Sequence, residues 1–236
     1  MSRSNPTEII PNPALRWFEW QGSKGNIRYY DKEKKENVGI ELPFEFILLD
    51  QLSTIKGWHD NSEAAIFANE VRDTRNEPFV VKSFKLREPI AEGFYADIKD
   101  KVKANGGSFV SNCYIAFTDD SGHLAVGSLQ FHGSALGGWM EFSQDKANRP
   151  ELFKKGIRIT GSKSGKKGSI TFEIPLFEFY ELSSDASEIA VDLDKELQAY
   201  LRNYFKHPRS EQAETPQEEE TSGQQPPEQD DDEIPF

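Results

Sequence analysis

The segment Val38-Gly-Ile-Glu-Leu-Pro-Phe-Glu-Phe-Ile-Leu48 carries an apolar side chain at every even-numbered position. Glycine, glutamate and proline fill most of the odd-numbered positions between them. Successive side chains of an extended strand point to opposite faces, so this alternation gathers the apolar side chains on one face. The segment therefore predicts a half-buried β-strand, and it favours a mainly β fold for the chain.

Other segments repeat this period of two. Ile27 and Tyr29 alternate with more polar neighbours, and a segment near residue 70 places its expected inner face on Phe67, Asn69 and Val71. Three more strands are expected over residues 79–86, 109–118 and 124–131.

A hairpin is expected near the end of this β-rich region. Residues 157–160 and 170–176 alternate on either side of the glycine- and lysine-rich segment 161–168, which predicts two strands joined by a long turn. After Pro175 the apolar phase shifts to Phe177 and Phe179, which predicts a bulge or a sheet edge at that proline.

Two helices are expected among the strands. The first has an apolar stripe that ends before Gly106-Gly107 and comprises Ala91, Tyr95, Ile98 and Val102. The second, residues 185–206, opens with Asp185 and Glu188 in a variant of the capping box and stops before Pro208. Its apolar stripe comprises Ile189, Leu193, Leu197, Leu201 and Tyr204.

These elements predict a mainly β protein, namely an OB-like barrel with added hairpins, one inserted helix and one C-terminal helix. A β-sandwich stays open as an alternative, because periodicity does not separate the two. We expect one domain over residues 1–207, which ends in the helix 185–206. Residues 208–236 are rich in Glu, Gln, Pro, Ser and Thr without periodicity, which predicts a disordered acidic tail.

The net charge of −12 describes this tail more than the body of the protein. Ten acids and no Lys or Arg lie between Glu211 and the C-terminus, whereas residues 1–210 hold 30 acids and 28 bases. The body is therefore nearly neutral, and the acidic composition does not exclude a nucleic-acid partner.

Composition also bears on the compartment. The single Cys113 excludes an internal disulfide framework and a multi-cysteine metal site. The first ten residues lack the apolar stretch of a secretory signal, and no segment is apolar enough to span a bilayer. We expect a soluble cytoplasmic protein that does not bind a membrane.

The sequence contains no recognisable catalytic motif. The four histidines are far apart, and none has metal-ligand spacing to a cysteine or another histidine. The segment 161–168 lacks the spacing of a phosphate-binding loop and lies between two expected strands, whereas such a loop leads into a helix. We therefore expect no enzyme activity, no cofactor and no metal.

The chain ends in a specific short segment that follows the polar tail. An apolar Ile-Pro-Phe preceded by four acids suits a docking tip, whose ring enters a pocket while basic residues at the rim bind the acids. The segment comprises Asp230, Asp231, Asp232, Glu233, Ile234, Pro235 and Phe236. It resembles the acidic tip of bacterial single-stranded DNA-binding proteins (SSBs), with Glu233 where Asp is more usual. That resemblance implies recruitment of replication and repair proteins.

The body resembles phage-encoded SSBs more than the cellular bacterial SSB domain. The similar segments are Tyr29-Tyr30-Asp-Lys, Leu42-Pro-Phe44, Asn69-Glu-Val-Arg72 and Gly133-Ser-Ala-Leu-Gly-Gly-Trp139. The resemblance implies a protein of a bacterial or phage-infected cell that coats single-stranded DNA with little sequence preference during replication, recombination or repair. It does not imply the cellular type of tetramer, and a homo-oligomer of another kind stays open.

Surfaces that bind single strands interleave aromatic rings for bases with Lys or Arg for phosphates. Aromatic residues next to a basic residue on the same expected face, or near expected strand ends, are therefore candidates, together with the basic hairpin segment. The candidate DNA-binding residues are Trp17, Trp20, Arg28, Tyr30, Trp58, Arg72, Arg75, Lys82, Phe84, Lys163, Lys166 and Lys167.

Two alternatives follow from the same residues. The segment Gln198–Phe205 fits the pattern of a sliding-clamp ligand, but Leu201 and Tyr204 also continue the apolar stripe of a packing helix. For the whole protein, the alternative is a β-rich interaction or structural protein without DNA function, whose tail serves solubility or docking.

Overall fold

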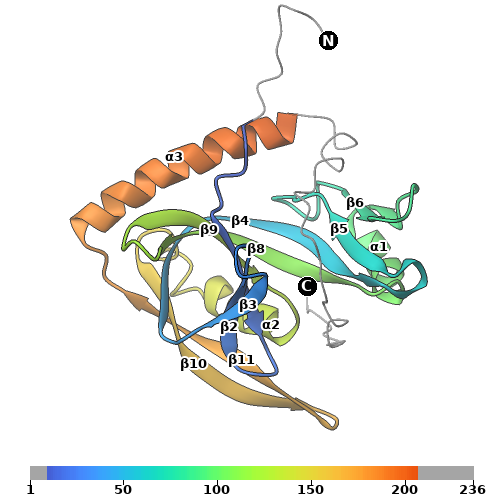
Figure 1. Ribbon diagram of the computed structural model, residues 1–236, viewed down its shortest axis with the longest axis horizontal. Helices are drawn as coiled ribbons and strands as arrows, with labels where there is room; N and C mark the ends of the chain where they lie inside the picture. The colour runs from blue at the N-terminus through green and yellow to red at the C-terminus, as the bar shows by residue number, and fades with distance from the viewer. Residues whose placement is uncertain (1–9, 207–236) are drawn as a thin grey trace, which may run out of the picture.

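The computed structural model describes residues 10–206 (Figure 1), and within this range the chain is mainly β with three α-helices. Its elements are β1 (Arg16–Gln21), β2 (Asn26–Asp31), β3 (Glu36–Ile40), β4 (Phe44–His59), the 3₁₀ turn Asp60–Ser62, β5 (Ala64–Ala68), β6 (Phe79–Ser83), β7 (Ala91–Gly93), α1 (Tyr95–Ala104), β8 (Gly107–Thr118), β9 (Leu124–Phe131), α2 (Gly133–Gln144), β10 (Gly156–Lys167), β11 (Ile170–Tyr180) and α3 (Ser184–Lys206). The predicted mainly β class is confirmed.

The strands form one mixed sheet in the order β3-β2-β1-β9-β8-β4-β5-β6-β7, and β10 pairs with both β4 and β11. Within residues 10–206, β1 and β9 make the one parallel pair. This order describes an open sheet, so it does not by itself establish the closed barrel that the sequence predicts. Among the described helices, none combines the length and apolarity needed to cross a bilayer.

Strand β4 is the longest element of the sheet and spans two regions of the molecule. Its first residues pair with β10, its last residues with β5, and β8 runs along most of its length. The predicted strand 38–48 is therefore split between β3 and β4. Residues 41–43 separate the two, and Pro43 has no N–H to donate to a ladder. The predicted phase is nevertheless correct, because Phe44, Phe46 and Leu48 all belong to one apolar cluster. The strand is not half-buried throughout, since Ile47 on its other face is buried in a different cluster.

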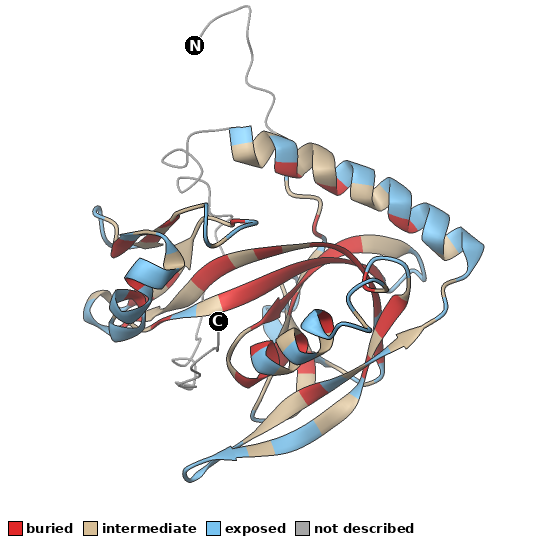
Figure 2. Ribbon diagram, turned by 180° about the vertical axis from the view of Figure 1, so that it is seen from behind, coloured by how far each residue is buried: buried red, intermediate tan, exposed pale blue. Residues whose placement is uncertain are grey.

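The interior consists of three apolar clusters, and the buried residues lie along the long central strands (Figure 2). The first lies between β1, β4, β8 and β9 on one side and α2 on the other, with Trp139 stacked on Phe131 at 5.1 Å between ring centroids. The second lies beneath α3, and the third beneath α1.

The predicted phase of the segment near residue 70 is correct at Val71, which is fully buried, but wrong at Phe67. Strand β5 ends at Ala68, and its buried side chains are Ala64 and Ile66, so Phe67 lies on the opposite face from the one expected. The sequence of β5 is apolar at every position, and the choice of face follows from pairing with β4 and β6.

The hairpin is longer than predicted. Strand β10 continues to Lys167, so the expected turn 161–168 is mostly strand, and the chain reverses at Gly168-Ser169. A side chain at Gly165 would collide with the Phe172 ring, which covers that glycine at 2.4 Å from the position of a Cβ. A bulge lies close to the expected position but in the other strand: the register shifts between Ile159 and Gly161 of β10, opposite Phe177 and Leu176, whereas Pro175 is regularly paired with Ser162.

Helix α2 was not predicted from the sequence. Its glycines, including Gly137 and Gly138, lower the intrinsic helix propensity and resemble a turn. Packing overrides this preference, since Leu136 and Trp139 are buried in the first cluster. The absence of a side chain at Gly138 lets the helix approach the hairpin, because a Cβ there would lie 2.7 Å from Ile174.

The other two helices lie where they were expected. In α1, Ile98 and Val102 pack on the third cluster, whereas Ala91 belongs to β7. Helix α3 buries Ala190, Leu197 and Leu201.

The expected details of α3 need two corrections. Ile189 is 46% exposed and does not belong to the packed stripe. Ser183, rather than Asp185, caps the helix with its side chain, which accepts from Ala186 N–H at 3.2 Å. Within the clamp-like segment, Leu201 is buried and the Tyr204 hydroxyl accepts from Glu70 N–H at 2.8 Å, so these residues serve packing.

We expect Leu197→Ala to lower the free energy of unfolding by about 2–5 kcal/mol, because Leu197 is fully buried on the inner face of α3, in the second cluster. Ile189→Ala on the same helix is the matched control and should change it by about 0.5 kcal/mol or less, since Ile189 is half exposed. Urea unfolding followed by circular dichroism measures both. Equal losses would contradict the docked position of α3.

Candidate nucleic-acid interface

One face of the β4–β5–β6 region carries aromatic and basic side chains in two cross-strand rows. In the first row three residues lie opposite one another in the strand register: Lys56 of β4 faces Phe67 of β5, and Phe67 faces Lys82 of β6. In the second row Trp58 is paired with Ala65, and Phe84 donates its N–H to the Ala65 carbonyl at 3.3 Å. We name the set Lys56, Trp58, Phe67, Lys82 and Phe84 the aromatic–basic face.

The aromatic and basic side chains share one face because apolar side chains of the same strands occupy the opposite face. Ile55, Ile66 and Val81 are buried against α1, so the residues that alternate with them are turned away from the helix. Gly57 allows β4 to approach the start of β8 closely, because a Cβ at this position would lie 2.1 Å from the Gly106 carbonyl oxygen. That approach fixes the backbone next to Trp58, whose N–H donates to Gly106.

The side chains of this face are at least partly exposed, and its two lysines make no ion pair within the described residues. Phe84 is 51% exposed, and its ring lies 4.6 Å from that of Phe67, between centroids. Within residues 10–206, no carboxylate lies within ion-pair distance of Lys56 or Lys82. The face therefore offers ring surface for planar groups and two cations for anionic ones.

A buried polar network borders the face where α3 ends. The Glu70 carboxylate accepts hydrogen bonds from the Asn112 amide and from the Tyr114 hydroxyl, the latter at 2.9 Å. Burial raises the pKa of Glu70, against the effect of these two hydrogen bonds and of the Lys56 charge. Tyr204 binds the backbone of Glu70, so the network connects α3 to the edge of the face.

The structure brings three of the candidate residues together: Trp58, Lys82 and Phe84. Trp17, Arg28 and Tyr30 belong to β1 and β2, and β9, β8 and β4 lie between β1 and β5 in the sheet. These residues form a separate surface in which Arg28 is paired with Glu19 and Tyr30 is 37% exposed.

Trp20 needs a correction as a candidate for stacking. It is 3% exposed and belongs to the first cluster, and its indole N–H donates to the Glu173 carbonyl at 2.8 Å. A ring that is covered on both faces cannot stack on a base, so we remove Trp20 from the candidate surface.

The two candidate arginines differ in their surroundings. Arg72 makes a bidentate contact with Asp50 at 2.7 and 2.9 Å, and its guanidinium lies over the Phe205 ring. Arg72 therefore connects β4 to α3, whereas Arg75 is exposed in the loop between β5 and β6.

The hairpin lysines lie in another region. Strand β10 pairs with the first residues of β4 and β5 with the last, twelve positions apart at Phe46 and Trp58. At about 3.3 Å per residue this is a separation of up to about 40 Å along β4. Lys163, Lys166 and Lys167 are exposed, and Lys163 lies 3.4 Å from a Glu141 carboxylate oxygen.

Lys56 and Phe67 were not among the candidates from the sequence. The alternation of Ile55 and Gly57 with Lys56 and Trp58 is a signal that was present for Lys56. Phe67 had no such signal, because β5 is apolar at every position. The candidate docking tip Asp230–Phe236 lies outside the described residues.

No protein-family model, no curated protein and no solved structure matches this chain.

The raised pKa of Glu70 predicts a pH-dependent stability. A carboxyl whose pKa is higher in the folded state binds its proton more tightly there, so its stabilising effect is complete at low pH and is lost as pH rises through the folded pKa. Glu70→Gln removes this titration. The free energy of unfolding of the variant, relative to the unmodified protein, should therefore increase as pH rises above the ordinary Glu value.

Urea unfolding at several pH values between about 4 and 8 measures this difference. Glu88→Gln, at an exposed position, is the control and should show a difference that does not vary with pH. A pH-independent difference for Glu70→Gln as well would contradict the effect of burial.

Proposed function

We propose that this protein binds single-stranded DNA with little sequence preference, and that the aromatic–basic face contacts the strand. The observation that carries the proposal is the clustering of Trp58, Phe67 and Phe84 with Lys56 and Lys82 on adjacent strands. A β-sheet surface with this composition supplies the two kinds of contact that an unpaired strand requires.

The chemistry of the face favours a single strand over a duplex. Aromatic rings bind bases by stacking, and a base offers its ring face only when it is unpaired and unstacked. Every base has such a face, so stacking tolerates any sequence. The ammonium groups of Lys56 and Lys82 would bind phosphates as point charges, which position the strand without reading it.

We further propose that the first cluster is the core of an OB-like barrel. Strand β11 contacts the β1–β2 turn, because Glu173 N–H donates to the Gly22 carbonyl at 2.8 Å and Trp20 donates to the Glu173 carbonyl. These contacts support closure of β1, β9, β8, β4 and the β10–β11 hairpin around the buried rings. In this interpretation β2, β3 and the β5–β7 region are additions to the barrel.

The tail would provide a second activity. We propose that residues 230–236 recruit replication, recombination or repair proteins, as the resemblance to the acidic tip of bacterial SSBs implies. The support for this part is the sequence of the segment: one large ring, Phe236, beside a run of acids.

A titration with a polythymidine oligonucleotide and a matched duplex tests the proposal. We expect tight binding of the single strand with quenching of Trp58 fluorescence, and much weaker binding of the duplex. Trp58→Ala or Phe84→Ala should each cost about 1–3 kcal/mol of binding free energy, because each would remove one stacking platform.

Phe94→Ala is the matched control, since Phe94 is also an exposed phenylalanine (41%) but lies at the start of α1. Its substitution should leave the affinity unchanged. Equal affinity for single strand and duplex, or no binding at low salt, would contradict DNA binding by this face.

The salt dependence separates the face from the hairpin. Each phosphate neutralised on a single strand contributes about −0.7 to the slope of log K against log salt concentration. With a six-nucleotide oligonucleotide, the double variant Lys56→Gln/Lys82→Gln should flatten this slope by about 1.4, because it removes two cations. The triple variant Lys163→Gln/Lys166→Gln/Lys167→Gln should leave it unchanged. The reverse result would place the phosphates at the hairpin.

A further inference from the structure

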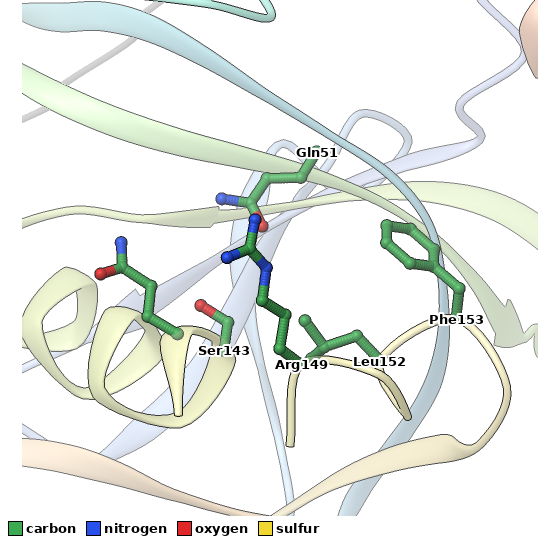
Figure 3. A pocket seen from close by; sticks show the side chains of 6 residues that line it. Gln51, Ser143, Arg149, Leu152 and Phe153 are labelled. Carbon is green, nitrogen blue, oxygen red and sulfur yellow. The ribbon is translucent and has the colours of Figure 1, made fainter. Parts of the chain in front are cut away.

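A hollow lies on the other side of β4 from the aromatic–basic face, between that strand and the loop that joins α2 to β10. Figure 3 shows this hollow, which has a volume of about 510 Å³. Its lining residues are Gln51, Ser143, Gln144, Arg149, Leu152 and Phe153. Gln51 is paired with Cys113 of the first cluster, so it faces away from Lys56 and Trp58 of the aromatic–basic face.

Arg149 provides an unpaired cation in this hollow. Its side chain extends toward the amide of Gln51 (Figure 3), and in the described part of the chain no carboxylate lies within ion-pair distance of its guanidinium. The loop around it is ordered: Arg149 N–H donates to the Asp145 carbonyl at 2.9 Å, and Asp145 Oδ1 accepts from Ala147 N–H at 2.7 Å. The backbone of Arg149 is therefore fixed beside the hollow, and within residues 10–206 its guanidinium makes no ion pair that would compete with an anion.

Phe153 provides a ring at the rim. It is 62% exposed, the highest value among the exposed large apolar side chains of residues 10–206. Figure 3 shows Arg149 between Ser143 and the Phe153 ring. Leu152 beside it is buried, so the backbone is anchored next to the exposed ring.

Polar groups complete the lining. Gln51 Oε1 accepts from the Trp139 indole N–H at 3.3 Å, a bond that restricts the orientation of the Gln51 amide. Ser143 and Gln144 add a hydroxyl and a second amide from the last turn of α2. Amides and hydroxyls of this kind form hydrogen bonds with the edges of nucleobases.

We propose that this hollow binds one nucleotide, with the phosphate at Arg149, the base against Phe153 and the base edge at Gln51 and Gln144. A planar guanidinium fork matches phosphate oxygens, an exposed ring matches an unpaired base, and the volume falls within the range of small-molecule pockets. An anion site alone would not explain the exposed ring and the two amides. The nucleotide site rests on this geometry, and its occupation by part of a bound DNA strand rests in addition on the proposed function.

The tryptophan indole N–H groups distinguish the two sites in one experiment. The Trp139 indole donates a hydrogen bond to Gln51, which lines the hollow, and Trp58 belongs to the aromatic–basic face. The Trp20 indole donates to the Glu173 carbonyl, and neither of these residues belongs to either site. Indole ¹⁵N–¹H correlation spectra of the full chain would be recorded during titration with thymidine 5′-monophosphate, inorganic phosphate or a six-nucleotide polythymidine. Trp58→Phe and Gln51→Ala identify the Trp58 and Trp139 signals.

We expect the monophosphate to shift the Trp139 signal and to leave that of Trp20 unchanged, and the oligonucleotide to shift both the Trp139 and Trp58 signals. Arg149→Gln and Phe153→Ala should each weaken the monophosphate affinity at Trp139 at least tenfold. Lys154→Gln is the matched control, because Lys154 is exposed on the same loop, does not line the hollow, and should leave the affinity unchanged.

Two results would overturn the nucleotide site: no shift of Trp139 with the monophosphate, or an equal shift and affinity with inorganic phosphate, which would make the hollow a simple anion site. Either result would leave the proposed function intact as long as the oligonucleotide shifts Trp58. A Trp139 shift with the monophosphate, without any response of Trp58 to the oligonucleotide, would support the nucleotide site and contradict the aromatic–basic face.

Discussion

The antiparallel pairing of β4 with β8 is the constraint on which the rest of the structure depends. All three apolar clusters draw residues from these two strands: Phe46 and Ile115 belong to the first, Leu52 and Tyr114 to the second, and Ile55 to the third, on which Phe109 of β8 packs. Helices α2 and α3 pack on opposite faces of this ribbon, and α1 covers its far end. A loss of register here would displace side chains in all three clusters together, since a shift of one residue moves every side chain to the other face.

The register shift at Leu48–Asp50 determines which side chains of β4 reach each candidate site. Before it, Phe44, Phe46 and Leu48 enter the first cluster from even-numbered positions. After it, Gln51 and other odd-numbered positions lie on that side of the sheet, and the even-numbered positions lie on the side of α3. Lys56 and Trp58 are therefore turned away from the side of β4 that carries the first cluster, and Gln51 is turned toward the hollow beside α2. The irregularity thus decides which of the two sites shares a side of the sheet with the first cluster. That Gln51 and Lys56 lie on opposite sides follows from their odd and even positions in the same uninterrupted stretch of β4.

Charge pairing separates the basic residues that hold the structure from those that are available to a ligand. Arg28, Arg72 and Arg158 lie within ion-pair distance of carboxylates on neighbouring elements. Exposed pairs of this kind stabilise a protein little, but they orient the guanidinium toward its partner. Lys56 and Arg149 have no carboxylate at that distance within residues 10–206, and each lies beside an exposed or half-exposed ring. A cation without an ion pair, beside an at least partly exposed ring, is the feature that the two sites share.

The sequence by itself determined the mainly β class, the strand 124–131, the positions of α1 and α3 and the common face of Lys82 and Phe84. Those features follow from periodicity within a few residues, which the local geometry of a strand or helix imposes. Tertiary structure alone decided that Phe67 faces outward, that Trp20 is buried and that the glycine-rich segment 133–144 is a helix. It also placed Arg149 beside Gln51, almost a hundred residues away in the chain. Local alternation shows that a strand has two faces, but the face that becomes buried depends on partners distant in sequence, and the energy of covering apolar surface is gained only when those partners meet.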